Sequence, residues 1–132
     1  MSQANVETIR QGFEAFGRGD LEAALVGIDP KVEVHEPADL PDAQVYHGHA
    51  GFLAALAKAR EMFDDIRTEP VEFIDAGDQV VVWVRITGRG HGSGARVEMY
   101  QAWTYRLRDG KVVRSDAYLD RAKALEAVGL QA

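Results

Sequence analysis

The sequence predicts an α+β fold in which helices gather on one face of an antiparallel sheet. Three observations support this prediction. Apolar residues recur at helical spacing in the first part of the chain, period-two alternation dominates from Arg67 onward, and Asp109-Gly110 is a strong signal for a tight hairpin. Helices followed by a meander of strands are typical of this class.

The composition is that of one globular domain spanning residues 1–132, with 46% hydrophobic and 27% charged residues. The net charge of −6 argues against a nucleic-acid partner and against an anionic membrane surface. No stretch approaches the roughly 18 consecutive apolar residues of a membrane span. The chain has no cysteine and its N-terminus lacks the features of a signal peptide, so we expect a cytoplasmic protein.

Two helices are predicted at the start of the chain. The first spans about Gln3 to Gly17 and ends in glycines, which take the left-handed conformation of a helix C-terminus at little cost. Its apolar stripe consists of Val6, Ile9, Phe13 and Phe16. Asp20 is then the expected N-cap of a second helix from Leu21 to about Gly27.

A short half-buried strand carries the first candidate functional residue. Apolar and polar residues alternate from Lys31 to His35, so Val32 and Val34 share one face. Glu36 continues that face, and Pro37 ends the strand because it has no amide proton. The pattern therefore places one carboxylate at the end of a half-buried face.

A loop and a third helix follow this strand. The segment from Glu36 to Ala43 is predicted as a loop because it contains prolines and aspartates, and the helix begins between His47 and Gly51. The residues expected on its buried side are Phe52, Leu53, Leu56, Ala59, Arg60 and Phe63.

The rest of the chain predicts a strand meander and a short C-terminal helix. The strands are expected at Arg67 to Asp75, Gln79 to Thr87, Arg96 to Arg108 and Lys111 to Leu119. Gly88 to Gly94 is expected as a flexible hairpin loop, and Asp120 as the N-cap of a helix that ends at Gly129. Three helices on one side of a bent sheet leave a concave, mostly apolar space, which is where small molecules tend to bind.

Several short motifs occur in an order that is informative for the fold. They are Phe13 to Leu21, Val32 to Pro37, Tyr46 to Gly48, Phe73 to Asp78, Leu107 to Val113 and Leu119-Asp120. Together they cover nearly the whole chain and resemble the nuclear-transport-factor-2-like superfamily, most closely its SnoaL-like polyketide cyclase branch. The resemblance implies a cone-shaped, strongly bent sheet with three helices on its concave face, and a homodimer that packs through the outer face.

The resemblance also implies candidate catalytic residues. In ketosteroid isomerases the general base is an acid just before a proline on the first strand, and Glu36 occupies that place. Their oxyanion hole needs a tyrosine and a protonated aspartate. Gly12 and Trp103 stand in those places here, so we do not expect steroid isomerisation. In SnoaL-like cyclases an acid near the end of the last strand is the base, and Asp120 or Asp116 matches it.

Each candidate also has a structural interpretation. Glu36 suits a general base if it faces an apolar cavity, and is otherwise a strand-end acid that faces water or pairs with an arginine. Asp120 is a good helix cap, and Asp116 can pair with Arg114 on the same strand face. His35 alternates to the face opposite Glu36, where a subunit contact or water is the expected environment.

Large amphipathic side chains are the candidate ligand contacts. Trp103, Trp83 and Tyr46 would line a pocket and offer indole or hydroxyl donors, although burial in the core also explains them. Gln101 shares the face of Trp103 and would orient a ligand by hydrogen bonding. Trp83 shares its strand face with Arg85, and the pattern leaves open which face is concave.

These observations predict a protein with a pocket for a small apolar or aromatic ligand, requiring no cofactor and no metal. His47-Gly48-His49 lacks the spacing and the third ligand of a metal site. If the protein is an enzyme, we expect cofactor-free acid–base chemistry of the isomerase or cyclase type on an apolar carbonyl or polyketide-like substrate, with Glu36 moving the proton.

Two alternatives are also consistent with the sequence. The first is a non-catalytic module for ligand binding or dimerisation. The second is an epoxide hydrolase, whose Asp-Arg-Asp set has candidates only in Asp116 with Arg85 or Arg114.

Overall fold

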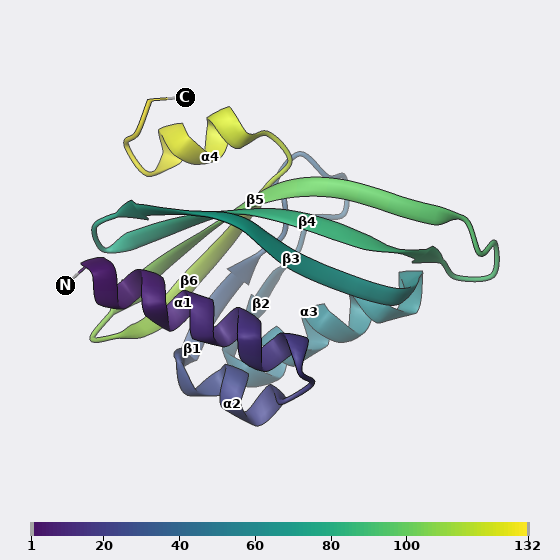
Figure 1. The fold of residues 1–132 in the computed structure, drawn as a ribbon, viewed down its shortest axis with the longest axis horizontal. Helices are drawn as coiled ribbons and strands as arrows, with labels where there is room; N and C mark the ends of the chain where they lie inside the picture. The colour runs from purple at the N-terminus through teal and green to yellow at the C-terminus, as the bar shows by residue number, and fades with distance from the viewer. Residues whose placement is uncertain (1, 132) are drawn as a thin grey trace.

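The computed structural model describes residues 2–131 and confirms the α+β prediction (Figure 1). The elements are α1 (Ser2–Gly17), α2 (Leu21–Val26), β1 (Ile28–His35), β2 (Val45–His47), α3 (Gly48–Met62), β3 (Phe63–Ala76), β4 (Gln79–Gly90), β5 (Arg96–Arg108), β6 (Lys111–Tyr118) and α4 (Arg121–Ala127). Within the described chain, no helix has both the length and the apolar character that crossing a membrane requires.

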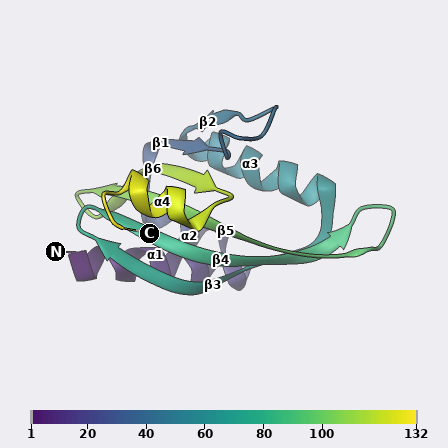
Figure 2. The same cartoon turned by 90° about the horizontal axis from the view of Figure 1, so that it is seen from above.

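One curved, open sheet organises the molecule. Its strand order is β2-β1-β6-β5-β4-β3, and every neighbouring pair is antiparallel except β1 with β6. Helices α1, α2 and α3 lie on one face, whereas α4 lies on the other (Figure 1). Seen from above, α4 lies over the left half of the sheet and the β4–β5 hairpin extends to the far right (Figure 2). The predicted bent, mostly antiparallel sheet is therefore confirmed.

The first two helices form where their caps and apolar stripe predict them. Val6 and Ile9 are buried, and Phe13 packs against the same core cluster. The chain leaves α1 through Gly19, which has a φ of 78° that favours glycine. The Asp20 carboxylate then accepts a hydrogen bond from the Ala23 amide at 3.0 Å, which satisfies one of the unpaired amides at the start of α2.

Alternation along β4 separates the two faces of the sheet. Val80, Val82, Val84 and Ile86 face the helices, and the three valines have no exposed surface. Val81 and Trp83 point the other way, where they pack with Ala102 and with the α4 residues Ala124 and Leu125. The valine row therefore belongs to the concave face and Trp83 to the convex face, a choice that the alternation alone leaves open.

Several boundaries differ from the sequence-based expectation. The short strand β2 was not predicted; it pairs with β1, with Val34 opposite Tyr46. Strand β1 starts at Ile28 and includes Pro30, which is tolerated because the pairing with β6 shifts register there. Strand β3 starts directly after α3, and β4 continues to Gly90, because the two strands pair along their whole length.

Helix α3 is also less buried than its apolar pattern predicts. Leu53 is 37% exposed, so its expected place on the buried side is wrong. No residue of α3 is fully buried. The inner side of the helix instead borders an open space, with Phe52, Leu56 and Ala59 facing it.

The valine row on β4 should carry much of the stability of the sheet. We expect Val82→Ala to lower the free energy of unfolding by about 2 kcal/mol, because two buried methyl groups are removed from a closed site. Val71→Ala, on the half-exposed surface of β3, is the matched control and should change it by less than about 0.5 kcal/mol. Urea unfolding measures both values, and equal losses would contradict this assignment of the core.

Candidate functional site

A cavity of about 370 Å³ lies between the concave face of the sheet and the helices. Its wall is mostly apolar and comes from α1, α2, α3 and five strands; prominent members are Ile9, Phe13, Phe16, Leu56, Phe63, Ile86, Met99 and Val112. The cavity exists because α1 and α3 rest on the two ends of the curved sheet without filling the space between them. Its size and apolar lining are typical of small-molecule sites.

Glu36 borders this cavity just beyond the end of β1. Its side chain is 21% exposed. The carboxylate accepts hydrogen bonds from the Gln44 amide at 3.0 Å and from the Tyr46 hydroxyl at 3.3 Å. The Lys58 ammonium lies 3.1 Å and 3.2 Å from its two oxygens. Three donors from a loop, β2 and α3 therefore hold the carboxylate in one position.

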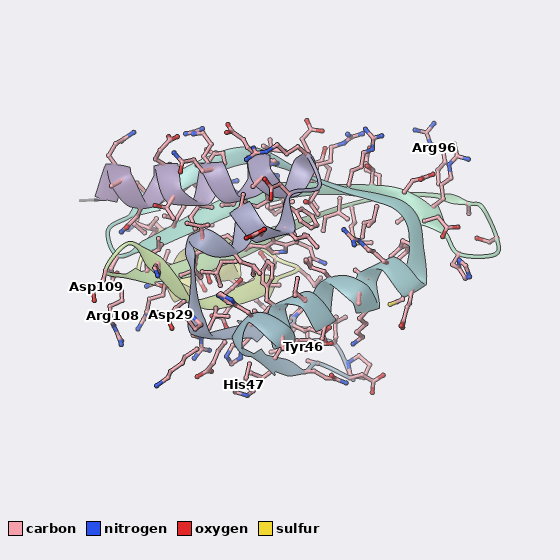
Figure 3. The ribbon with its side chains drawn as sticks, turned by 90° about the horizontal axis from the view of Figure 1, so that it is seen from below. Asp29, Tyr46, His47, Arg96, Arg108 and Asp109 are labelled. Atoms are coloured by element: carbon pink, nitrogen blue, oxygen red, sulfur yellow. The ribbon has the colours of Figure 1, made fainter. Side chains whose placement is uncertain are left out.

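Lys58 links this carboxylate to the surface of α3. The hydrogen bond to Glu36 raises the pKa of the Lys58 ammonium above its ordinary value, so Lys58 is protonated and positively charged at neutral pH. The lysine side chain is 38% exposed, and a pair of this exposure contributes little to stability. Tyr46 completes the group from β2, beside the start of α3 (Figure 3). Tyr46 does not itself border the cavity, so its contact with Glu36 is its connection to the site.

Trp103 and Gln101 form part of the cavity wall on β5. The Trp103 indole donates a hydrogen bond to the Gln101 side-chain oxygen at 2.9 Å, and its ring stacks on Phe13 with centroids 6.0 Å apart. The Gln101 amide nitrogen lies 3.9 Å from the sulfur of Met99, which is only a weak acceptor. The indole donor is thus occupied, while the amide nitrogen retains donor capacity for a ligand.

The cavity residues that the sequence analysis did not identify include Tyr105 on β5 and Ser115 on β6. They are directly opposite one another across the two strands. Burial raises the pKa of the Tyr105 phenol well above its ordinary range, so the hydroxyl stays protonated and can donate. The available signal was period two, because Tyr105 lies two residues after Trp103 and shares its face.

Trp83 does not line the cavity, which corrects its assignment as a ligand contact. It lies on the convex face, where its ring stacks on Tyr100 with centroids 5.5 Å apart. The Arg121 guanidinium lies 5.6 Å above the ring. The strand alternation that turns Val82 and Val84 inward necessarily turns Trp83 outward.

The two weaker catalytic candidates also lie outside the cavity wall. Asp116 forms two hydrogen bonds with Arg114, at 2.9 Å and 3.0 Å, and this pairing raises the pKa of the Arg114 guanidinium. Asp120 accepts a hydrogen bond from the Ala122 amide at 2.8 Å and caps α4. Both carboxylates thus have the structural roles that were the alternatives to catalysis.

The histidines have local partners as well. The His35 ring lies 3.0 Å from the Glu33 carboxylate and 4.0 Å from that of Asp116, and the residue also borders the cavity. His49 contacts the carbonyl oxygen of Ile28 at 2.7 Å. Within residues 2–131, no group of three metal-ligating side chains comes together.

Fold and site together define a helix-lined cone with a mostly apolar cavity, one carboxylate at its edge and hydroxyl groups on its sheet wall. The model of the SnoaL-like domain family matches residues 9–115. The chain therefore belongs to the SnoaL-like family, as the sequence motifs predicted. No curated protein matches the sequence.

Solved structures support the same fold. A nuclear-transport-factor-2-like protein of unknown function from Burkholderia pseudomallei is 24% identical, with a TM-score of 0.79 and coverage of 96% of this chain and 98% of that one. TerC, co-crystallised with polyporic acid, is 28% identical, with a TM-score of 0.78 and coverage of 95% and 98%. A similar protein from Burkholderia xenovorans is 30% identical, with a TM-score of 0.73 and coverage of 89% and 90%.

The buried phenol of Tyr105 should make the free energy of unfolding depend on pH in the alkaline range. The pKa of this phenol is higher in the folded than in the unfolded protein. Its contribution to the free energy of unfolding is therefore fully present below pH 10, roughly the pKa of an unfolded tyrosine, and is lost as the pH rises above that value. Above that pH, the unfolding free energy of the wild type should fall relative to Tyr105→Phe by about 1.4 kcal/mol per pH unit.

Urea unfolding between neutral and alkaline pH measures this slope. Tyr100→Phe, on the same strand but on the exposed convex face, is the control and should follow the wild type. Parallel curves for the wild type and Tyr105→Phe would contradict the burial of this phenol.

Proposed function

We propose that this protein binds a small, mostly apolar, carbonyl-bearing molecule in the cavity and that Glu36 moves a proton on it. The observation that carries the proposal is the position of one held carboxylate at the edge of a mostly apolar cavity. SnoaL-like membership supports a ligand-binding or a cyclase and isomerase type of protein. The crystal of TerC with polyporic acid supports a ligand with an aromatic, oxygen-bearing skeleton.

The chemistry requires only groups of this chain. The Glu36 carboxylate accepts a proton from the carbon next to the ligand carbonyl, and the electron pair of that C–H bond moves toward the carbonyl oxygen to give an enolate. Return of the proton to the same or another carbon completes an isomerisation, and attack of the enolate carbon on a second carbonyl closes a ring. Tyr46 and Lys58 hold the base in place, which is how such side chains serve general acid–base catalysis.

Binding without chemistry is the second candidate. Its support is that the Glu36 oxygens already accept hydrogen bonds from three donors, which limits their capacity to take a proton. The epoxide hydrolase alternative loses its support, because Arg85 pairs with Glu98 and Arg114 with Asp116, away from the cavity wall.

A homodimer through the convex face belongs to the same proposal. The face carries the stacked pair of Trp83 and Tyr100, of which Tyr100 is 41% exposed. Aromatic side chains of this kind are enriched at subunit interfaces.

Ligand binding can be followed through tryptophan fluorescence, because one of the two tryptophans lines the cavity and the other does not. In Trp83→Phe, the remaining Trp103 should be quenched by acetylnaphthalene in a saturable manner. In Trp103→Phe, the remaining Trp83 should show far weaker quenching. Saturable quenching that is equal in the two variants would place the aromatic ketone outside the cavity.

Proton transfer by Glu36 can be tested by hydrogen exchange at the acetyl group of the same ketone. In deuterium oxide, the wild type should accelerate loss of the methyl proton signal, and Glu36→Gln should slow this exchange by about 10²-fold or more. The melting temperature should stay nearly unchanged, because a glutamine oxygen still accepts hydrogen bonds and the lost ion pair is partly exposed.

Asp116→Asn is the matched control, since it makes the same acid-to-amide change on the convex side and should exchange like the wild type. Saturable binding with no exchange above the buffer rate would favour the binding protein over the enzyme. A large loss of stability in Glu36→Gln would instead mark Glu36 as a structural acid.

A further inference from the structure

The cavity has a second polar region on its sheet wall. Tyr105 and Ser115 are paired residues on β5 and β6, and both border the cavity. Neither hydroxyl forms a hydrogen bond with another described residue. Both nevertheless reach open space, because within residues 2–131 no polar side-chain atom is both sealed off and without a partner. The space available to them on this face of the sheet is the cavity.

The surrounding described residues leave this pair no hydrogen-bond partner other than water or a ligand in the cavity. The Tyr105 ring packs edge-on against Phe13 at 6.3 Å, and its other neighbours include the buried Val80 across from it on β4. A polar group in such an apolar setting is unfavourable without a hydrogen-bond partner. Burial keeps the phenol protonated, so both residues offer O–H donors in the same direction.

The pair is separated from Glu36 by a distance that the strand register defines. Val34, two residues before Glu36, is the partner of Ser115 across β1 and β6. Two residues of strand correspond to about 7 Å along the sheet, and β5 lies two strand spacings, about 10 Å, from β1. A single carbonyl group cannot span such a separation, whereas a ligand with two fused rings can.

We infer that Tyr105 and Ser115 form a second subsite that binds an oxygen at the far end of the ligand. The inference rests on the proposed function and names its substrate class: a flat or ring-forming molecule with a reactive carbonyl at the Glu36 end and a hydroxyl or carbonyl oxygen remote from it. The two hydroxyls donate to that oxygen and fix which carbon of the ligand faces Glu36. They are positioning residues, since they act on the end of the ligand that does not react.

A pair of probes isolates this interaction. Both are acetylnaphthalenes, and they carry on the opposite ring either a hydroxyl or a methyl group of similar size. Calorimetry should show that the wild type binds the hydroxyl probe about five- to tenfold more tightly than the methyl probe. This ratio corresponds to the net contribution of an ordinary hydrogen bond. In Tyr105→Phe and in Ser115→Ala, this preference should fall to about twofold or less, with little change for the methyl probe.

The control is Tyr100→Phe, which removes a hydroxyl from the convex side of the same strand and should keep the wild-type preference. Equal affinities of the two probes for the wild type, or an undiminished preference in both Tyr105→Phe and Ser115→Ala, would overturn the second subsite. Exchange at the acetyl group reports separately on Glu36. Exchange without a hydroxyl preference refutes only the subsite, whereas a wild type that binds neither probe refutes the proposed function and the subsite together.

Discussion

The packing of Phe13 is the interaction on which the cavity depends. This ring of α1 stacks on Trp103 and meets Phe73 and Tyr105 edge-on, with centroid distances of 6.0 Å, 6.2 Å and 6.3 Å. It therefore links α1 to two strands, β3 and β5, and holds two cavity residues in fixed orientations. Because aromatic contacts of this kind are directional, they set the height of α1 above the sheet, and α3 closes the other side.

The resulting cavity is mostly apolar, with polar groups at its edge and on its sheet wall. At one end, the Glu36 carboxylate is held by Tyr46 and Lys58 where the wall meets the surface. On the sheet wall, Tyr105 and Ser115 present hydroxyls from deep within the apolar lining. The ligand that we propose, hydrophobic in the middle with oxygen at both ends, would give each of these polar groups a partner.

The convex face of the sheet has a different character. Several of its charged residues form ion pairs, as in Arg85 with Glu98 and Arg114 with Asp116, and α4 packs against its apolar residues. Asp116 and Asp120 were catalytic candidates because they lie near the end of the last strand. In the structure Asp116 pairs with Arg114, and Asp120 caps α4. The two faces thus differ in their surroundings: the concave face carries the buried valine row and borders the cavity, whereas α4 packs on the convex face.

Local patterns in the sequence predicted most of the elements, because caps, periodicity and turn residues act over a few positions. Asp20 and Asp120 mark helix starts, and Asp109-Gly110 marks the last hairpin. The pattern missed β2, because three residues are too few for alternation to be visible and the strand forms only by pairing with β1. Leu53 was predicted on the buried side of its helix but is exposed. The spacing of apolar residues indicates which side of a helix faces inward, but not how closely other elements pack against that side.

The site was predicted only in part, because local alternation shows which residues share a strand face but not what that face packs against. Period two put Glu36 on the face of Val34, and put Trp103 and Gln101 on one face, from the sequence alone. Which face of β4 and β5 is concave was decided only by the packing of α1 and α4 on opposite sides of the sheet. That packing turned Trp83 outward, put Tyr105 and Ser115 on the wall of the cavity, and joined Lys58 to a carboxylate 22 residues away. Contacts between distant segments form only when all the helices and strands pack together, so local sequence patterns do not predict them.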